Sequence, residues 1–88
     1  MAIIILKHKV ENFKKWKPYY DNDRERRQKA GLKEIICGQD SEEPNMVYMI
    51  FESNDPSQVR KMIQDPQLKE VMDEAGVIEK PKLIIIEE

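Results

Sequence analysis

The sequence predicts an α+β fold in which strands and helices follow one another in the order βαββαβ. Two runs near the ends of the chain, residues 3–6 and 83–86, are apolar at every position. Because strand side chains alternate between the two faces of a sheet, strands of this kind are expected to be buried on both faces. Two helical stretches with an apolar stripe and one hairpin pattern occupy the chain between these runs, which gives the mixed order.

The length of the chain limits how such a sheet is covered. With 88 residues the chain is long enough for one small domain, which we expect to span residues 1–88. Its helices are sufficient to cover one face of the sheet. The simplest cover for the other face is a second copy of the chain, so the sequence predicts a homodimer that associates through the sheet. Association also helps a domain of this size, which is only marginally stable alone.

Composition and charge exclude several classes of function. The chain carries 15 basic and 17 acidic residues, for a formal net charge of −2, and its basic cluster at residues 24–29 is interleaved with acidic side chains. We interpret that cluster as a solvated helix face and expect no nucleic-acid partner. No run approaches the length of a membrane span, and the N-terminal run does not resemble a signal peptide. We therefore expect a cytoplasmic protein without a membrane partner.

Residues that bind metals and cofactors are scarce. Cys37 is the only cysteine, and no Cys/His spacing typical of a zinc site occurs. We interpret Cys37 as a small buried apolar side chain, because no cationic group lies beside it in the sequence to stabilise a thiolate. The three glycines are too scattered to form a phosphate-binding loop. We therefore expect no metal and no other cofactor.

The first strand and the first helix are predicted in the N-terminal third of the chain. Residues 2–10 form the strand, and Asn12 can accept hydrogen bonds from the free amides of the first helical turn. The helix is expected to continue to about Ala30 and to end at Gly31. Pro18 removes one backbone donor and is expected to kink or restart the helix. Three aromatic residues spaced three and four apart form its apolar stripe: Phe13, Trp16 and Tyr20.

A hairpin follows the first helix. Residues 32–39 and 46–52 are predicted to be its two strands. The loop between them, residues 40–45, is polar and rich in turn-forming residues. The two strands are therefore expected to pair with each other.

The second helical region contains two start signals. Asp55 followed by Pro56 places a cap and a proline at the first helical position, and Asp65 followed by Pro66 repeats the pattern. The region is therefore expected to break at the second signal, to resume, and to end at Gly76. Its inward-facing residues are predicted to be Val59, Met62, Ile63, Leu68, Val71, Met72 and Ala75.

The last strand is predicted at residues 82–87. The strands that flank each helical region are expected to be parallel to each other, because such connections are right-handed crossovers. The two halves then interleave into one four-stranded antiparallel sheet with both helical regions on one face. This is a ferredoxin-like arrangement.

The order of short motifs along the chain resembles a known superfamily. The matching residues cover most of the sequence and are His8-Lys9-Val10, Phe13, Trp16-Lys17-Pro18, Arg27, Ala30-Gly31-Leu32, Pro44-Asn45, Pro66, Leu68-Lys69-Glu70 and Ala75-Gly76-Val77. They are similar to the dimeric α/β-barrel superfamily, and within it to small stand-alone proteins related to antibiotic-biosynthesis monooxygenases. The resemblance implies that two sheets pack face to face across a two-fold axis. It also implies a ligand cavity within each subunit, between sheet and helices.

The same resemblance bears on activity. The superfamily includes monooxygenases, haem-degrading enzymes, cyclases, isomerases and proteins of unknown role, so it does not define one reaction. Similar sequences often carry a histidine in the first helix, about two turns after the position of Trp16. This chain has Asp23 there.

His8 is the first candidate for catalysis. It is the only histidine, and it shares a strand face with Leu6 and Val10. An imidazole titrates near neutral pH and can move a proton to or from a bound molecule. The alternative is a partly buried histidine that is bonded to a backbone carbonyl.

The first helix supplies three further candidates. Trp16 and Tyr20 lie one turn apart and either stack on a flat ligand or form ordinary core. The same stripe turns polar at Asp23 and Arg27, which suggests that this end of the helix lines an opening. Asp23 either orients the imidazole or is solvated. We place the site between this helix and the sheet, with His8 at the floor and the three helix candidates along the wall. Tyr48, on the third strand, lines either the cavity or the dimer interface and is included as a candidate substrate-binding residue.

Three functions remain open from the sequence. One is a cofactor-free enzyme that oxygenates, cyclises or isomerises a small apolar or aromatic molecule. The second is a non-catalytic protein that binds a metabolite in the same cavity, either as a binding protein or as a stress-associated protein. The third is a structural dimer without a ligand. A cavity that exposes His8 favours the first two functions, and a cavity filled by Trp16 and Tyr20 favours the third.

Overall fold

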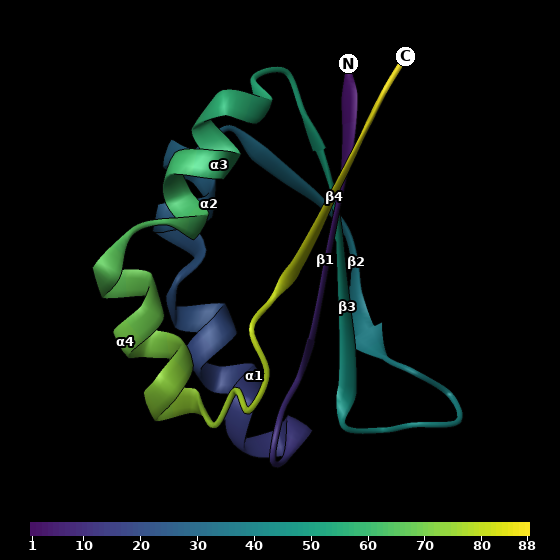
Figure 1. The fold of residues 1–88 in the computed structure, drawn as a ribbon, viewed down its shortest axis with the longest axis vertical. Coiled ribbons are helices and arrows are strands. Elements are labelled where there is room, and N and C mark those ends of the chain that lie inside the picture. Colours follow the sequence, from purple (N-terminus) through teal and green to yellow (C-terminus); the bar gives the residue numbers. More distant parts are fainter.

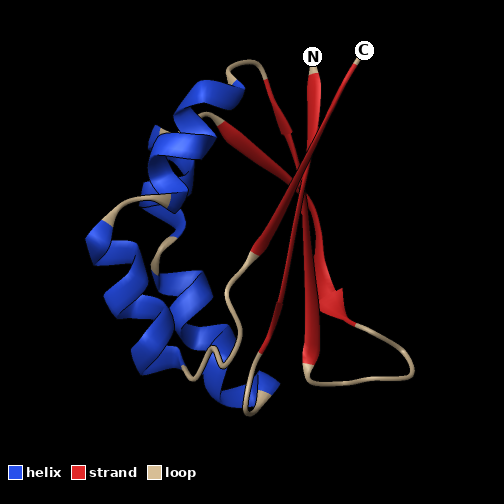
Figure 2. Cartoon of the chain, in the orientation of Figure 1, coloured by secondary structure: helices blue, strands red, loops and turns tan.

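The computed structural model describes residues 1–88 and contains one four-stranded sheet with all helices on one of its faces (Figure 1, Figure 2). The sheet order is β2-β3-β1-β4, and every neighbouring pair is antiparallel. The predicted ferredoxin-like fold is therefore confirmed. The elements are β1 (Ala2–Lys9), α1 (Phe13–Asn22), α2 (Arg24–Lys29), β2 (Leu32–Gln39), β3 (Met46–Ser53), α3 (Pro56–Ile63), α4 (Pro66–Ala75) and β4 (Lys82–Glu87).

The core lies between the sheet and the helices, and strict alternation in the two central strands creates it. Every second side chain of β1 and β3 is buried under the helices, and the side chains between them face the other way. Because β1 and β3 are hydrogen-bonded neighbours, their buried residues form one continuous apolar surface. The most deeply buried side chains are Ile4, Val10, Val47, Phe51 and Val59.

The first helical region breaks at a different residue from the one predicted. We expected Pro18 to kink or restart the helix, but α1 continues through Pro18 to Asn22, and α2 begins after Asp23. The missing amide of a proline leaves one backbone carbonyl of the preceding turn without a partner, here that of Lys14. Both Lys14 and Pro18 are exposed, so water can satisfy that carbonyl.

The second helical region breaks where its start signals predict. α3 ends at Ile63, and α4 begins at Pro66. The Asp65 carboxylate accepts a hydrogen bond of 2.9 Å from the Gln67 amide and so caps α4. Gly76 ends this helix with a φ of 86°, a left-handed conformation that favours glycine. None of the helices is long and apolar enough to cross a membrane.

A row of isoleucines crosses the open face of the sheet from edge to edge. The register places Ile36 of β2 opposite Ile50, Ile50 opposite Ile5, and Ile5 opposite Ile84 of β4. Ile3 and Ile86 form a second apolar pair beside this row. No helix covers this face (Figure 1). At the two sheet edges the exposed fraction is 56% for Ile36 and 38% for Ile84.

Candidate functional site

A small, mainly apolar cavity lies between the helices and the sheet. Its volume is about 60 Å³. One water molecule needs at least roughly 15 Å³, so the cavity has room for a few waters. An aromatic ring needs roughly 150 Å³, so such a ligand requires the side chains of the wall to move apart. Four of the predicted site residues lie in its wall: His8, Trp16, Tyr20 and Asp23. The rest of the wall is formed by Tyr19, Arg27, Met49, Phe51, Met62, Leu68, Val71, Met72 and Ala75.

His8 is the polar group at the sheet side of this cavity. It occupies one of the inward-facing positions of β1, and only 5% of its surface is exposed. Its ring meets the Trp16 ring edge to face, with 5.3 Å between centroids. Neither ring nitrogen, Nδ1 or Nε2, has a hydrogen-bond partner in the protein. The alternative of an imidazole bonded to a backbone carbonyl is therefore not observed.

Burial without a partner sets the charge state of His8. Removing the imidazole from water disfavours its cationic form and lowers its pKa from 6.5 to about 4. The ring is consequently neutral at pH 7 and can accept a proton. A buried polar atom without a hydrogen bond costs about 1–3 kcal/mol, and a bound molecule or water that supplies the missing partner recovers that free energy.

Trp16 and Tyr20 form an aromatic part of the wall, and Tyr20 is fixed by a hydrogen bond to Glu34, which lies outside the cavity wall. Their rings stack with 4.9 Å between centroids and 28° between planes. The Tyr20 hydroxyl donates to Glu34 Oε1 at 2.5 Å. Burial and this hydrogen bond raise the pKa of Tyr20 far above its ordinary value, so the phenol keeps its proton. The Tyr20 ring is thus packed against Trp16, and its proton is committed to Glu34, so Tyr20 contributes to the wall as a fixed aromatic side chain.

Sequence reasoning missed Glu34 because it assigned no inward face to residues 32–39. Glu34 pairs with the inward-facing Phe51, and the register of β2 against β3 shifts only after it, between Glu34 and Ile36. Alternation from the buried Leu32 places Glu34 on the same face. The two-residue spacing from Leu32 was therefore a signal for its inward position, but not for its bond to Tyr20.

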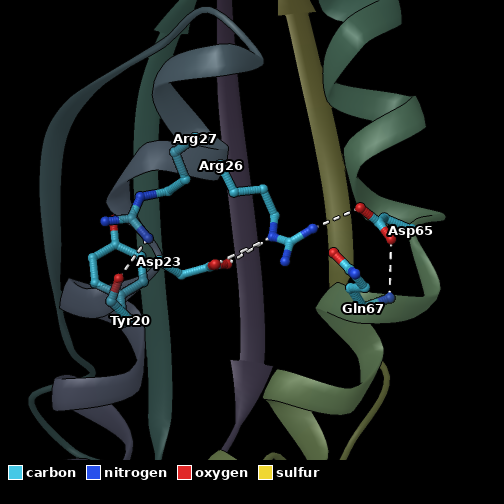
Figure 3. Close-up of polar contacts among 6 residues, drawn as sticks. All are labelled: Tyr20, Asp23, Arg26, Arg27, Asp65 and Gln67. Atoms are coloured by element: carbon cyan, nitrogen blue, oxygen red, sulfur yellow. Dashed lines mark hydrogen bonds and ion pairs between the residues drawn. The ribbon is translucent and has the colours of Figure 1, made fainter.

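Asp23 lies in the cavity wall but does not orient the imidazole. Both of its carboxylate oxygens accept from Arg26 Nε, at 3.0 and 3.2 Å. Arg26 Nη1 also donates to Asp65 Oδ2 at 2.6 Å, so one guanidinium joins the two helix breaks (Figure 3). The predicted catalytic role of Asp23 beside His8 is corrected to a structural one. The physical reason is local, because Asp23 separates α1 from α2 and Arg26 follows three residues later.

Tyr48 does not belong to the cavity. It lies between the inward-facing residues Val47 and Met49 on β3, so its side chain is on the open face of the sheet. The Lys7 ammonium is 5.6 Å from the centre of its ring on that face. The prediction of Tyr48 as a substrate-binding residue is therefore wrong for this cavity, and its other predicted position, at a dimer interface, stays open.

Arg27 is a wall residue, as its predicted position on the stripe of the first helix indicates, and does not lie on the solvated face to which its basic cluster was assigned. Its guanidinium carbon lies 3.7 Å from the centre of the Tyr20 ring, and Nη1 donates to the Tyr20 carbonyl at 2.6 Å (Figure 3). A signal for this placement did exist. Arg27 follows Tyr20 by seven residues, which is the spacing of one helix face.

The side chains that could bind a metal ion or act as a thiol nucleophile are the next feature of the chain. No group of three His, Cys, Asp or Glu residues is placed to bind a metal ion. Cys37 is half-buried, and burial raises the pKa of its thiol to about 11. The thiol is therefore protonated at neutral pH, in agreement with its interpretation as a small apolar side chain.

Comparison with known proteins identifies the fold. No protein-family model matches the sequence, and no curated protein matches it either. Among solved structures, a protein from Bordetella bronchiseptica that carries the provisional description antibiotic biosynthesis monooxygenase aligns with 99% of this chain and 95% of its own, at a TM-score of 0.76 and 12% identity. The fold is that of the antibiotic biosynthesis monooxygenase-like proteins.

Two further structures extend the comparison. A protein from Nitrosomonas europaea with the same provisional description has a TM-score of 0.61 and 13% identity over 100% of this chain and 98% of its own. A NIPSNAP-family protein of unknown function from Agrobacterium tumefaciens has a TM-score of 0.69 and 11% identity over 98% of this chain and 86% of its own. At these identities the likeness concerns the fold alone. It confirms the ferredoxin-like fold of the single chain, and the pairing of two sheets across a two-fold axis stays a prediction.

The lowered pKa of His8 predicts a specific dependence of stability on pH. Between pH 6.5 and about 4 the unfolded chain binds a proton at His8 that the folded chain does not bind. The free energy of unfolding therefore decreases as the pH falls through this window, by an amount on the order of 3 kcal/mol in full. Urea unfolding of the wild type and of His8→Gln at several pH values should show this loss in the wild type only. Equal slopes in the two proteins would contradict the assignment.

Proposed function

We propose that this protein is a small enzyme in which His8 removes a proton from an apolar or aromatic molecule bound between the sheet and the helices. The observation that carries the proposal is a neutral imidazole, buried in the wall of a mainly apolar cavity, with both nitrogens free to bond a ligand. A buried polar group usually has a partner, so two unpartnered nitrogens on one ring indicate a place for one.

The proposed step is a single proton transfer. A C–H or O–H bond of the ligand breaks, the proton moves to a ring nitrogen of His8, and the ligand keeps the electron pair as an enolate or an oxyanion. The anion then stabilises the new imidazolium, because an adjacent opposite charge raises a histidine pKa. Exclusion of water by the apolar wall strengthens this interaction. Both a cofactor-free oxygenation and a cyclisation begin with such an anion.

The fold comparison supports this proposal without defining the reaction. Several proteins of the same fold are described as antibiotic biosynthesis monooxygenases, and others have no assigned role. Fold alone does not determine chemistry, so the argument rests on the side chains of the cavity. A second function, binding without catalysis, uses the same cavity, and the experiment on proton transfer separates the two.

Isotope exchange tests the proton transfer directly. We expect the wild type in D₂O to accelerate loss of the acidic methylene signals of 2-indanone or 2-tetralone, two aromatic ketones that bind when the cavity wall opens. His8→Gln should lose at least about 100-fold of that acceleration, as is typical for removal of a general base. Tyr48→Phe, on the other face of the sheet, serves as the matched control and should exchange like the wild type. Binding of the ketones to the wild type without any acceleration would favour the non-catalytic function.

We also propose that the working unit is a homodimer formed through the open face of the sheet. Ile5 lies at the centre of that face and is flanked directly by Ile50 and Ile84. An apolar surface that crosses a whole sheet is uncommon on a monomeric protein and marks an interaction site. A second copy offers the same isoleucines in return, which is the self-complementarity that a two-fold interface requires.

A charged residue in the isoleucine row should separate the two copies. Ile5→Asp places a carboxylate at the centre of the proposed interface, where it would be buried without a partner, and we expect a monomer. Ile78→Asp makes the same change at a residue that is 52% exposed and lies outside the sheet, and it should leave the dimer intact. Sedimentation velocity at micromolar concentration measures both. A wild type that sediments as a stable monomer would refute the dimer.

A further inference from the structure

The geometry points to a ligand that is an apolar or aromatic carboxylate, with its carboxylate bound by Arg27. This inference rests on the proposed function, because it takes the cavity beside His8 as the ligand site. It adds the chemical class of the ligand and a residue that recognises it. Some polar groups of the cavity wall are bonded within the protein, and others are free to bind a ligand.

Two polar groups of the wall are engaged. The Asp23 carboxylate is paired with Arg26 at 3.0 Å, and the Tyr20 hydroxyl donates to Glu34. The groups that remain for a ligand are the two nitrogens of the neutral His8, the guanidinium of Arg27 and the hydroxyl of Tyr19, whose side chain is partly open to solvent. Of these, only Arg27 carries a charge.

Arg27 is the half-buried cation of α2 that makes no ion pair within the protein, whereas Arg24, which also makes none, is exposed. Arg26 is paired with Asp23 and Asp65, and Lys29 lies 3.6 Å from Glu25. Arg27 makes no ion pair, and its single hydrogen bond to the protein is the one to the Tyr20 carbonyl. A guanidinium has five N–H donors, so most of the donors of this half-buried cation lack a protein acceptor.

The position of Arg27 is also fixed before any ligand binds. Its guanidinium carbon lies 3.7 Å from the centre of the Tyr20 ring, and Nη1 donates a hydrogen bond to the Tyr20 carbonyl. A side chain held in this way loses little conformational freedom when it binds an anion. The planar fork of a guanidinium matches the two oxygens of a carboxylate. A ligand with an apolar ring and a carboxylate would place the ring against the apolar side chains of the wall. Its carboxylate would accept hydrogen bonds from Arg27.

A matched pair of small ligands tests the inference. 4-Ethylbenzoate and 4-ethylbenzamide have the same shape and differ in charge, and the indole N–H signal of Trp16, the only tryptophan, reports binding at the cavity. In NMR titrations of the full chain at pH 7 we expect the carboxylate to bind at least about tenfold more tightly than the amide, as a charge-assisted hydrogen bond provides. Arg27→Gln should bring the two affinities within about twofold of each other, and Arg27→Lys should keep part of the preference.

Arg24→Gln is the matched control, because it removes the same charge from the same helix at an exposed residue outside the cavity wall. It should keep the full preference for the carboxylate. Equal affinities in the wild type would overturn the anionic class, and a preference that survives Arg27→Gln would overturn the assignment to Arg27. Binding of neither ligand would overturn this inference together with the proposed function. A carboxylate preference without ketone exchange would remove only the catalytic step and leave the inference standing.

Discussion

The alternation of side chains along β1 is the constraint on which the rest of the molecule depends. Successive residues of a strand face opposite sides of the sheet, so Leu6 and His8 lie under the helices while Ile5 and Lys7 lie on the open face. A shift of one residue in the pairing would exchange the two sets. The same register therefore buries the imidazole in the cavity wall and aligns the isoleucines at the proposed interface. The candidate site and the candidate dimer are two consequences of one strand pairing.

Two consecutive arginines on α2, Arg26 and Arg27, make different electrostatic contacts. Arg26 is paired with Asp23 and Asp65 and joins the two helix breaks, so its charge is satisfied within the protein. Arg27 points to the Tyr20 ring and keeps unused donors at the cavity wall. Because neighbouring residues of a helix are about 100° apart around its axis, adjacent positions serve different surroundings. One arginine stabilises the frame of the site, and the other is available to a ligand.

The sequence was sufficient for features that depend on local chemistry and periodicity. Both Asp-Pro signals mark true helix starts, because a cap and a fixed φ act within one turn. The position of His8 under the helices follows from alternation alone. The contacts of Glu34 and Arg27 with Tyr20 did not follow, because periodicity places a residue on a face and tertiary packing sets what it touches there. Asp23 was assigned to His8 on proximity, and the structure gives it to Arg26, which is closer in the chain and carries a permanent charge.

The central claim is that His8 accepts a proton from a molecule bound beside it. Because His8 is the only histidine, ¹⁵N labelling of histidine gives the signals of one ring, and these report its protonation without interference. We predict a neutral ring at pH 7 in the free protein, since burial lowers its pKa to about 4, and an imidazolium signal when an acidic aromatic ligand such as a nitrophenol fills the cavity. A ring that stays neutral, with unchanged ¹⁵N shifts while the Trp16 signal reports a bound ligand, would contradict this account of the site.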